Sequence, residues 1–170
     1  SQMLKDEVAL SKEKMKKIDI GPILQSVVDD YNSIHNVKKN IEISFRSDGK
    51  EYYFINGIEN RIEQIIANLL DNSISFSKNG SHILVDVSIS SQNEISIKII
   101  DEGLGFKEKD TNKIFKRFYS NRPDKFGEHS GLGLNIVKNL VDIHEGTILA
   151  FNRENSQGAE IQINFPSAKS

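Results

Sequence analysis

The chain has no cysteine, no tryptophan, only three prolines and almost no excess charge. Without cysteine it can form no disulfide, no thiolate metal site and no cysteine nucleophile, which fits a reducing compartment. A net charge of −2 at pH 7 gives no electrostatic reason to bind nucleic acid. No apolar run approaches the roughly 18 residues that a membrane helix needs, and no signal peptide is visible. We therefore expect a domain that is soluble by itself.

The 170 residues, 37% of them hydrophobic, suffice for one core, and the apolar positions follow two periods. Alternation predicts strands at 18–20, 41–45, 52–55, 83–89, 95–99, 147–152 and 159–165. Helical spacing predicts helices that begin at Gly21, span 59–76 and follow Ser130, and turns are expected at Asp48-Gly49 and 91–93. Because no regular βαβ period appears, we expect an α+β fold, a two-layer α/β sandwich. Its single sheet would be mixed and mostly antiparallel, with helices on one face.

Three carboxamide residues stand four positions apart on the predicted helix 59–76, namely Gln64, Asn68 and Asn72. At this spacing they share one helix face, which flanks the apolar stripe. A carboxamide oxygen is a neutral, hard ligand that suits a Mg²⁺ ion bound also by water and by nucleotide phosphates. The stripe therefore indicates a metal site in a cleft, and the alternative is a polar face that meets only solvent.

The predicted strand 95–99 leads into the sequence Asp101-Glu102-Gly103-Leu104-Gly105. A carboxylate at the end of an apolar strand can be partly buried and then needs a partner, for which the exocyclic amine of adenine is a suitable donor. The two glycines permit close backbone approach. The alternative is an acidic turn that simply ends the strand.

A glycine-bearing loop at 127–133 runs directly into an apolar-periodic helix. The hydroxyl of Ser130 and the backbone N–H groups of 131–134 can point at one phosphate there. An ordinary glycine-rich helix start is the alternative. The preceding stretch, 102–130, has no sustained period, which is typical of a functional or mobile segment.

In order and spacing these motifs resemble those of the catalytic and ATP-binding domain of bacterial sensor histidine kinases. That family belongs to the superfamily of DNA gyrase B, the Hsp90 chaperone and MutL, and the resemblance covers about 18–166. Its N box is matched by 68–73, its G1 box by 101–105, its F box by 114–119 and its G2 box by 129–134. The resemblance implies a Bergerat-type fold with a flexible ATP lid, and ATP and Mg²⁺ as cofactors. It also implies transfer of the ATP γ-phosphate to a histidine on a separate domain.

The resemblance also implies roles for single residues. Asn68 would bind Mg²⁺ and serve catalysis together with Arg122, and Asn72 would lie near the phosphates. Phe76 would pack on adenine, whose amine would donate to Asp101. The remaining implied ATP-binding residues are Gly103 and Gly105 at adenine, Tyr119 in the lid, and His129, Ser130, Gly131, Leu132, Gly133 and Leu134 at the phosphates.

Two departures from the family pattern are Ser75, where a lysine is common, and Glu145, where a glycine is common. Gln64 helps to distinguish a kinase from an ATP hydrolase, because hydrolytic members of the superfamily carry at this position a glutamate that activates water. A neutral glutamine is a poor general base, so ATP should persist until another nucleophile arrives. Two alternatives stay open: an ATP hydrolase of the same superfamily, and a degenerate regulatory domain that binds nucleotide.

The acceptor histidine of the family has no counterpart among His35, His82, His129 and His144. His144 is expected to be structural, since a cation suits a helix C-terminus. We therefore expect 1–17 to be the end of a dimerisation helix or linker, and 18–170 the catalytic domain. The partners would be a dimerisation and phosphoacceptor domain of the same protein and, indirectly, a response regulator. The fragment would be monomeric, a cytoplasmic part of an inner-membrane sensor.

Overall fold

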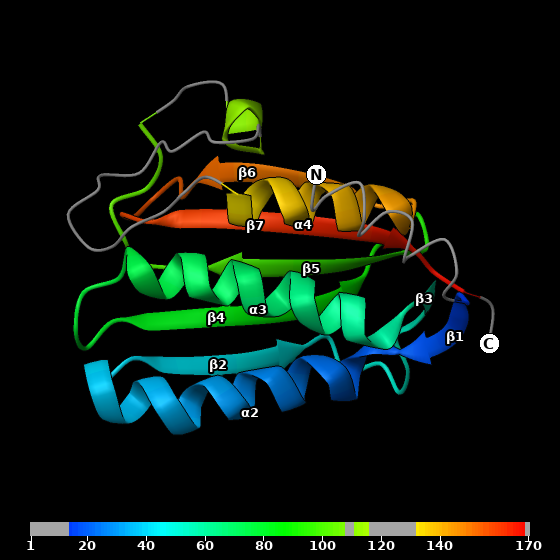
Figure 1. The fold of residues 1–170 in the computed structure, drawn as a ribbon, viewed down its shortest axis with the longest axis horizontal. Coiled ribbons are helices and arrows are strands. Elements are labelled where there is room, and N and C mark those ends of the chain that lie inside the picture. The colour runs from blue at the N-terminus through cyan, green and yellow to red at the C-terminus, as the bar shows by residue number, and fades with distance from the viewer. Residues whose placement is uncertain (1–13, 108–110, 116–131, 169–170) are drawn as a thin grey trace.

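The computed structural model describes residues 14–107, 111–115 and 132–168. These residues form two layers, a sheet and a set of helices that covers one of its faces (Figure 1). The helices are α2 (Ile20–Lys39), α3 (Glu59–Ser75), the short 3-10 helix η1 (Thr111–Phe115) and α4 (Leu132–Ile143). The predicted two-layer α/β sandwich is confirmed.

The main sheet has five strands in the order β2-β4-β5-β7-β6. Strand β2 runs parallel to β4, and the other three pairings are antiparallel, so the sheet is mixed and mostly antiparallel, as predicted. The strands are β2 (Glu42–Ser47), β4 (His82–Ile89), β5 (Glu94–Ile100), β6 (Thr147–Asn152) and β7 (Ala159–Pro166).

A second, two-stranded sheet pairs β1 (Lys16–Asp19) with β3 (Phe54–Gly57). The expectation of one sheet, with a turn at Asp48-Gly49 that joins β2 to β3, is therefore wrong. The backbone N–H of Asp48 donates to the carbonyl oxygen of Val87 over 3.1 Å, and Asp48 Oδ2 accepts from the N–H of Ile89 over 3.0 Å. The chain thus continues along β4 beyond the end of β2. Alternation along a strand shows which face is buried but not which strand is its neighbour.

The N-terminal part of the described chain also differs from expectation. The segment 1–17 is expected to be the end of a dimerisation helix or a linker, but Lys16 and Lys17 belong to β1, and 1–13 lie outside the described residues. Helix α2 begins just after, and Asp19 Oδ1 accepts from the N–H groups of Gly21 over 3.2 Å and of Tyr53 over 2.9 Å. The start of α2 is therefore tied to the residue before β3.

The core lies between the two layers. Helix α3 contributes five fully buried side chains at helical spacing, Ile62, Ile65, Ile66, Leu69 and Leu70. Each such burial stabilises the fold by about 1.5–3 kcal/mol, so the stripe fixes the rotation of α3 and with it the direction of the neighbouring polar residues. No helix in the described ranges combines the length and the apolar surface that crossing a bilayer requires.

Candidate functional site

The polar residues of α3 lie beside its buried stripe, as predicted. Gln64 and Asn68 are half-buried, whereas Asn72 is only 6% exposed. Gln64 Oε1 accepts from Nη1 of Arg61 over 3.1 Å. Asn72 Nδ2 is buried and has no hydrogen-bond partner among the described residues. An unpaired buried amide costs about 1–3 kcal/mol, so this nitrogen is suited to an acceptor that the described residues do not supply.

Asp101 stands where β5 ends, and its side chain is 2% exposed. The expected burial of this carboxylate is thus confirmed. Its Oδ1 accepts from the backbone N–H groups of Gly103 over 2.9 Å and of Ala159 over 3.2 Å. The backbone N–H of Asp101 in turn donates to the carbonyl oxygen of Ala159 over 2.9 Å. These bonds fix the carboxylate in one orientation.

The turn after Asp101 lies directly against the end of α3. A Cβ atom on Gly103 would come within 2.8 Å of the carbonyl oxygen of Phe76 and 3.1 Å of Asp101 Oδ1. Only glycine permits this approach. Phe76 follows the last residue of α3 and is buried. The fold therefore brings Phe76, Asp101 and Gly103 together from two segments that are distant in sequence.

Asn152, the last residue of β6, contacts the same turn and was not predicted. Its Oδ1 accepts from the backbone N–H of Phe106 over 2.7 Å, and its Nδ2 donates to the carbonyl oxygen of Phe106 over 3.0 Å. Gly105, the residue before, has a φ of +79°. Nothing in the local sequence signals this contact, since it joins residues 46 positions apart.

Helix α4 begins at Leu132, within the predicted phosphate-binding motif, with Gly133 exposed and Leu134 half-buried in its first turn. It lies beside α3 on the same face of the sheet (Figure 1). The amide of Asn135 donates to the carbonyl oxygen of Phe115 over 3.1 Å and so ties α4 to η1. The other predicted site residues, Tyr119, Arg122, His129, Ser130 and Gly131, lie outside the described residues.

His144 follows α4 and corrects one expectation. It is 4% exposed, and burial lowers the pKa of its imidazole. Its Nδ1 lies 2.8 Å from the carbonyl oxygen of Leu140, and its Nε2 accepts from the backbone N–H of Ile58 over 3.1 Å. A ring that donates through one nitrogen and accepts through the other is neutral. The structural role is thus supported, but the expected positive charge is wrong, because burial outweighs the attraction of the helix end.

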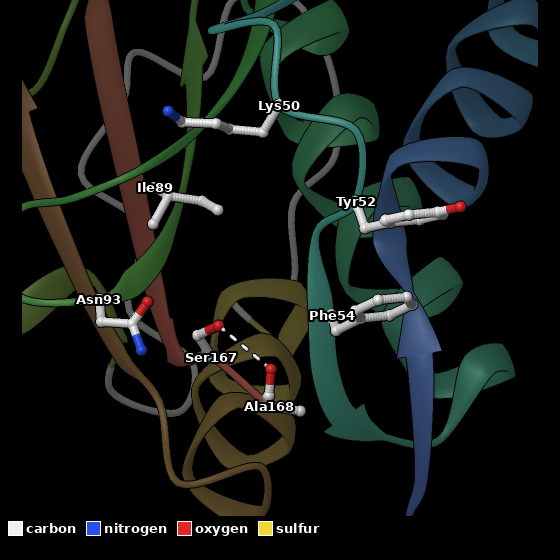
Figure 2. A pocket seen from close by; sticks show the side chains of 7 residues that line it. All are labelled: Lys50, Tyr52, Phe54, Ile89, Asn93, Ser167 and Ala168. Atoms are coloured by element: carbon white, nitrogen blue, oxygen red, sulfur yellow. Dashed lines mark hydrogen bonds between the residues drawn. The ribbon is translucent and has the colours of Figure 1, made fainter. Parts of the chain in front are cut away.

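A separate hollow of about 580 Å³ lies away from these residues (Figure 2). Tyr52 and Phe54 stack there with ring centroids 4.9 Å apart. Ile89 and Asn93 flank the turn between β4 and β5, whereas Asp101 follows the opposite end of β5. The hollow and the 101–106 turn therefore lie at opposite ends of the sheet. The residues that line it are Lys50, Tyr52, Phe54, Ile89, Asn93, Ser167 and Ala168.

Known proteins resemble this chain in sequence and in structure. Residues 57–169 match the family model of the histidine kinase-, DNA gyrase B- and HSP90-like ATPases. The sensor protein ChvG of Rhizobium meliloti is 32% identical over 158 residues, which cover 89% of the chain and 27% of ChvG. The chain therefore spans little more than a quarter of that relative's length.

Solved structures agree on the fold. The catalytic domain of the histidine kinase ThkA gives a TM-score of 0.77 at 23% identity, covering 91% of this chain and 97% of that domain. Full-length ShkA, solved in complex with AMPPNP, gives a TM-score of 0.76 at 26% identity over 92% of this chain and 32% of ShkA. The arrangement of α3, α4 and the sheet is thus one that other chains share.

Proposed function

Because the chain belongs to the family of histidine kinase-, DNA gyrase B- and HSP90-like ATPases, we propose that it is the catalytic ATP-binding domain of a sensor histidine kinase. It binds ATP with Mg²⁺ and transfers the γ-phosphate to a histidine on a separate helical domain of the same protein. One observation carries the proposal: the buried carboxylate of Asp101 is held against the end of α3, the helix that bears Asn68 and Asn72.

Asp101 is the proposed acceptor for the exocyclic amine of adenine. Its two backbone bonds hold the carboxylate before the base arrives, so little ordering remains to be done on binding. Phe76 and Gly103 lie against Asp101 and would line the same adenine site, and Gly105 would shape the backbone that leaves it. A neutral donor is the fitting partner for a carboxylate that already has two backbone donors.

Asn68 and Asn72 are the proposed ligands for Mg²⁺ and for the phosphates. The unpaired Nδ2 of Asn72 fits this role, because an amide N–H donates readily to an anionic phosphate oxygen. Asn68, one turn earlier on the same face, would hold Mg²⁺ through its carboxamide oxygen. When bound, Mg²⁺ would neutralise negative charge on the phosphates during transfer of the γ-phosphoryl group from ADP to the imidazole.

The first turn of α4 is the proposed phosphate site. The N–H groups of Leu132, Gly133 and Leu134 are among the donors that a helix start leaves without an intrahelical acceptor. We assign His129, Ser130 and Gly131 to the same site from the resemblance alone. Tyr119 and Arg122 are assigned to the lid on the same ground, with Arg122 as the charge that stabilises transfer.

Gln64 favours transfer to histidine over hydrolysis. Its carbonyl oxygen accepts from Arg61, and a carboxamide so bound offers no base that could activate water. The phosphoryl group is therefore kept for a better nucleophile, the imidazole of the phosphoacceptor domain. Hydrolysis would instead appear as steady phosphate release that Gln64→Ala abolishes.

The proposed parent is a two-component sensor in the inner membrane, with this domain on the cytoplasmic side. Its partners are the phosphoacceptor domain of the same protein and, through the phosphohistidine, a response regulator. The relatives named as sensor proteins support this proposal, and so does a second structure of ThkA, in which that kinase is in complex with the response regulator TrrA. By itself the chain is proposed to be monomeric.

Calorimetric titration with a non-hydrolysable ATP analogue and Mg²⁺ tests the proposal. The informative variant is Asp101→Asn, which can keep an oxygen for Gly103 and Ala159 but turns an NH₂ group toward the base. We expect affinity to fall about tenfold to a hundredfold, as for a lost hydrogen bond to a charged group. Asp86→Asn, which alters a carboxylate that pairs with Arg46 on the surface, is the control and should bind normally. Absence of binding by the unaltered chain would refute the proposal and favour a degenerate domain.

A further inference from the structure

Asn152 holds the backbone of one residue by both of its polar groups. Its carboxamide accepts from the N–H of Phe106 over 2.7 Å and donates to the carbonyl oxygen of the same residue over 3.0 Å. Only a carboxamide carries a donor and an acceptor side by side in this way. Carboxylate and hydroxyl side chains reproduce one half of the contact at most. Phe106 is thus held by a two-point clamp.

The clamp requires the glycine that precedes it. Gly105 has a left-handed φ of +79°, and a Cβ atom there would lie 2.7 Å from Asn152 Oδ1. With this left-handed conformation the backbone of Gly105 passes close to the carboxamide of Asn152, where a side chain could not fit. Gly105 and Asn152 are therefore two parts of one contact.

The strand that neighbours β6 holds the other end of the same turn. Asn152 and Ala159 are directly paired across β6 and β7. Ala159 donates its N–H to Asp101 Oδ1 and accepts from the N–H of Asp101. One cross-strand pair thus holds the segment 101–106 at both ends, at its carboxylate through Ala159 and at its exit through Asn152. The position of the carboxylate depends on both attachments.

From this geometry we propose that Asn152 is a positioning residue for adenine selectivity. The inference rests on the proposed function, because it assumes that Asp101 accepts from the adenine amine. Asn152 acts through the backbone of Gly105 and Phe106 and so determines where the 101–106 turn presents its carboxylate. Its loss loosens the turn and lowers the preference for a base that carries an exocyclic amine, while Asn68, Asn72 and α4 still hold the phosphates.

The test compares two nucleotides by calorimetry with Mg²⁺: a non-hydrolysable ATP analogue, and the same analogue built on purine, which lacks the exocyclic amine. The unaltered chain should prefer the adenine form. Asn152→Ala should reduce that preference at least about fivefold, as expected for two lost hydrogen bonds, mainly through weaker binding of the adenine form. Asn152→Asp retains the acceptor for the N–H of Phe106 but sets an oxygen against its carbonyl, and it should lose as much.

The chain offers a matched control. Asn32 on α2 clamps Ile43 in the same way, with bonds of 2.7 and 2.8 Å, but it does so on β2, the edge strand opposite to β6. Asn32→Ala should therefore cost stability but leave the preference for adenine unchanged. Asn152 is itself exposed, so its removal opens no cavity in the core and the variant should fold.

The possible results distinguish failure of the inference about Asn152 from failure of the proposed function. An unchanged preference in Asn152→Ala, with normal binding by the unaltered chain, would overturn the inference and leave the proposed function intact. An equal loss in Asn32→Ala would also overturn it, since the effect would then follow stability. Failure of the unaltered chain to bind either nucleotide would remove the proposed function and the inference with it.

Discussion

Nε2 of His144 accepts a hydrogen bond from the backbone N–H of Ile58, over 3.1 Å and across 86 positions of the chain. Ile58 is the N-cap residue of α3, and that helix has no side-chain cap of its own. The carbonyl oxygen of Leu140, in the last turn of α4, binds the other ring nitrogen. A single neutral imidazole therefore joins the start of α3 to the end of α4, the two helices that carry the proposed phosphate and metal site.

The first prediction follows from the lowered pKa of His144. Burial disfavours protonation of His144 in the folded state. As pH falls below 6.5, the usual pKa of histidine, the unfolded chain therefore binds more protons than the folded chain. The contribution of neutral His144 to the free energy of unfolding should therefore be complete above that pH and should decline below it. Urea unfolding of the chain and of His144→Gln, which keeps a neutral acceptor for Ile58, should show a shallower decline for the variant. A decline in His144→Gln that is as steep as in the unaltered chain would contradict the assignment.

The second prediction separates two costs of a side chain at a left-handed glycine. Gly105 and Gly80 have φ values of +79° and +84°, but only at Gly105 would a Cβ atom meet another group within 4 Å. Both alanine variants should lose about 1–2 kcal/mol of stability from the backbone strain. Only Gly105→Ala should also weaken binding of the ATP analogue, because it displaces Asn152. Thermal unfolding and titration of both variants measure this, and equal nucleotide affinity in the two would count against the clamp.

A third prediction concerns the unpaired amide of Asn72. Asn72→Leu removes a buried nitrogen that has no partner in the described part of the chain, so the free energy of unfolding should stay the same or rise by up to about 1 kcal/mol. Nucleotide affinity should nevertheless fall, because a phosphate donor is lost. Asn32→Leu is the opposite case, since it leaves the N–H and the carbonyl of Ile43 without their hydrogen-bond partner. It should lower the free energy of unfolding by about 1–3 kcal/mol. Denaturant unfolding and titration of both variants decide, and a less stable Asn72→Leu with normal affinity would show a purely structural asparagine.

The fourth prediction is that the chain alone does not phosphorylate itself. His144 is buried and bound on both ring nitrogens, and Nε2 of His82 lies 2.6 Å from the hydroxyl of Ser44. Incubation with γ-labelled ATP should leave no acid-labile phosphohistidine on the chain. Label should appear on the phosphoacceptor domain of the parent protein when that domain is added. Acid-labile label on the chain alone would refute the prediction.

Local pattern predicted much of the fold and the elements of the site. The stripe on α3 has the period of a half-buried helix, so its length and the direction of Asn72 follow from neighbouring residues alone. Asp101 is predictable as well, because an apolar strand that ends in a carboxylate is a local signal. The pairing of β2 was not predictable in the same way, since an alternating strand suits several neighbours and Asp48 selects β4 only in the folded chain.

The parts that were missed depend on contacts across the chain. The clamp of Asn152 on Phe106 joins β6 to a distant turn, and an asparagine at a strand end is by itself unremarkable in sequence. The neutral state of His144 likewise depends on burial, which the sequence near a helix end does not show. The roles of both residues follow from hydrogen bonds that form only in the folded chain.

Asp101 supports the turn with the same side chain that is proposed to recognise the base. A researcher who needs an inactive but intact form of the protein should therefore avoid Asp101→Ala, because that change would remove the support of the turn and the proposed ligand contact together. Asn68 is the better target, since it stands on the rim of a helix whose packing is secured by other side chains. For the same reason, natural variants that have lost Asp101 would be expected to be short-lived in the cell as well as silent.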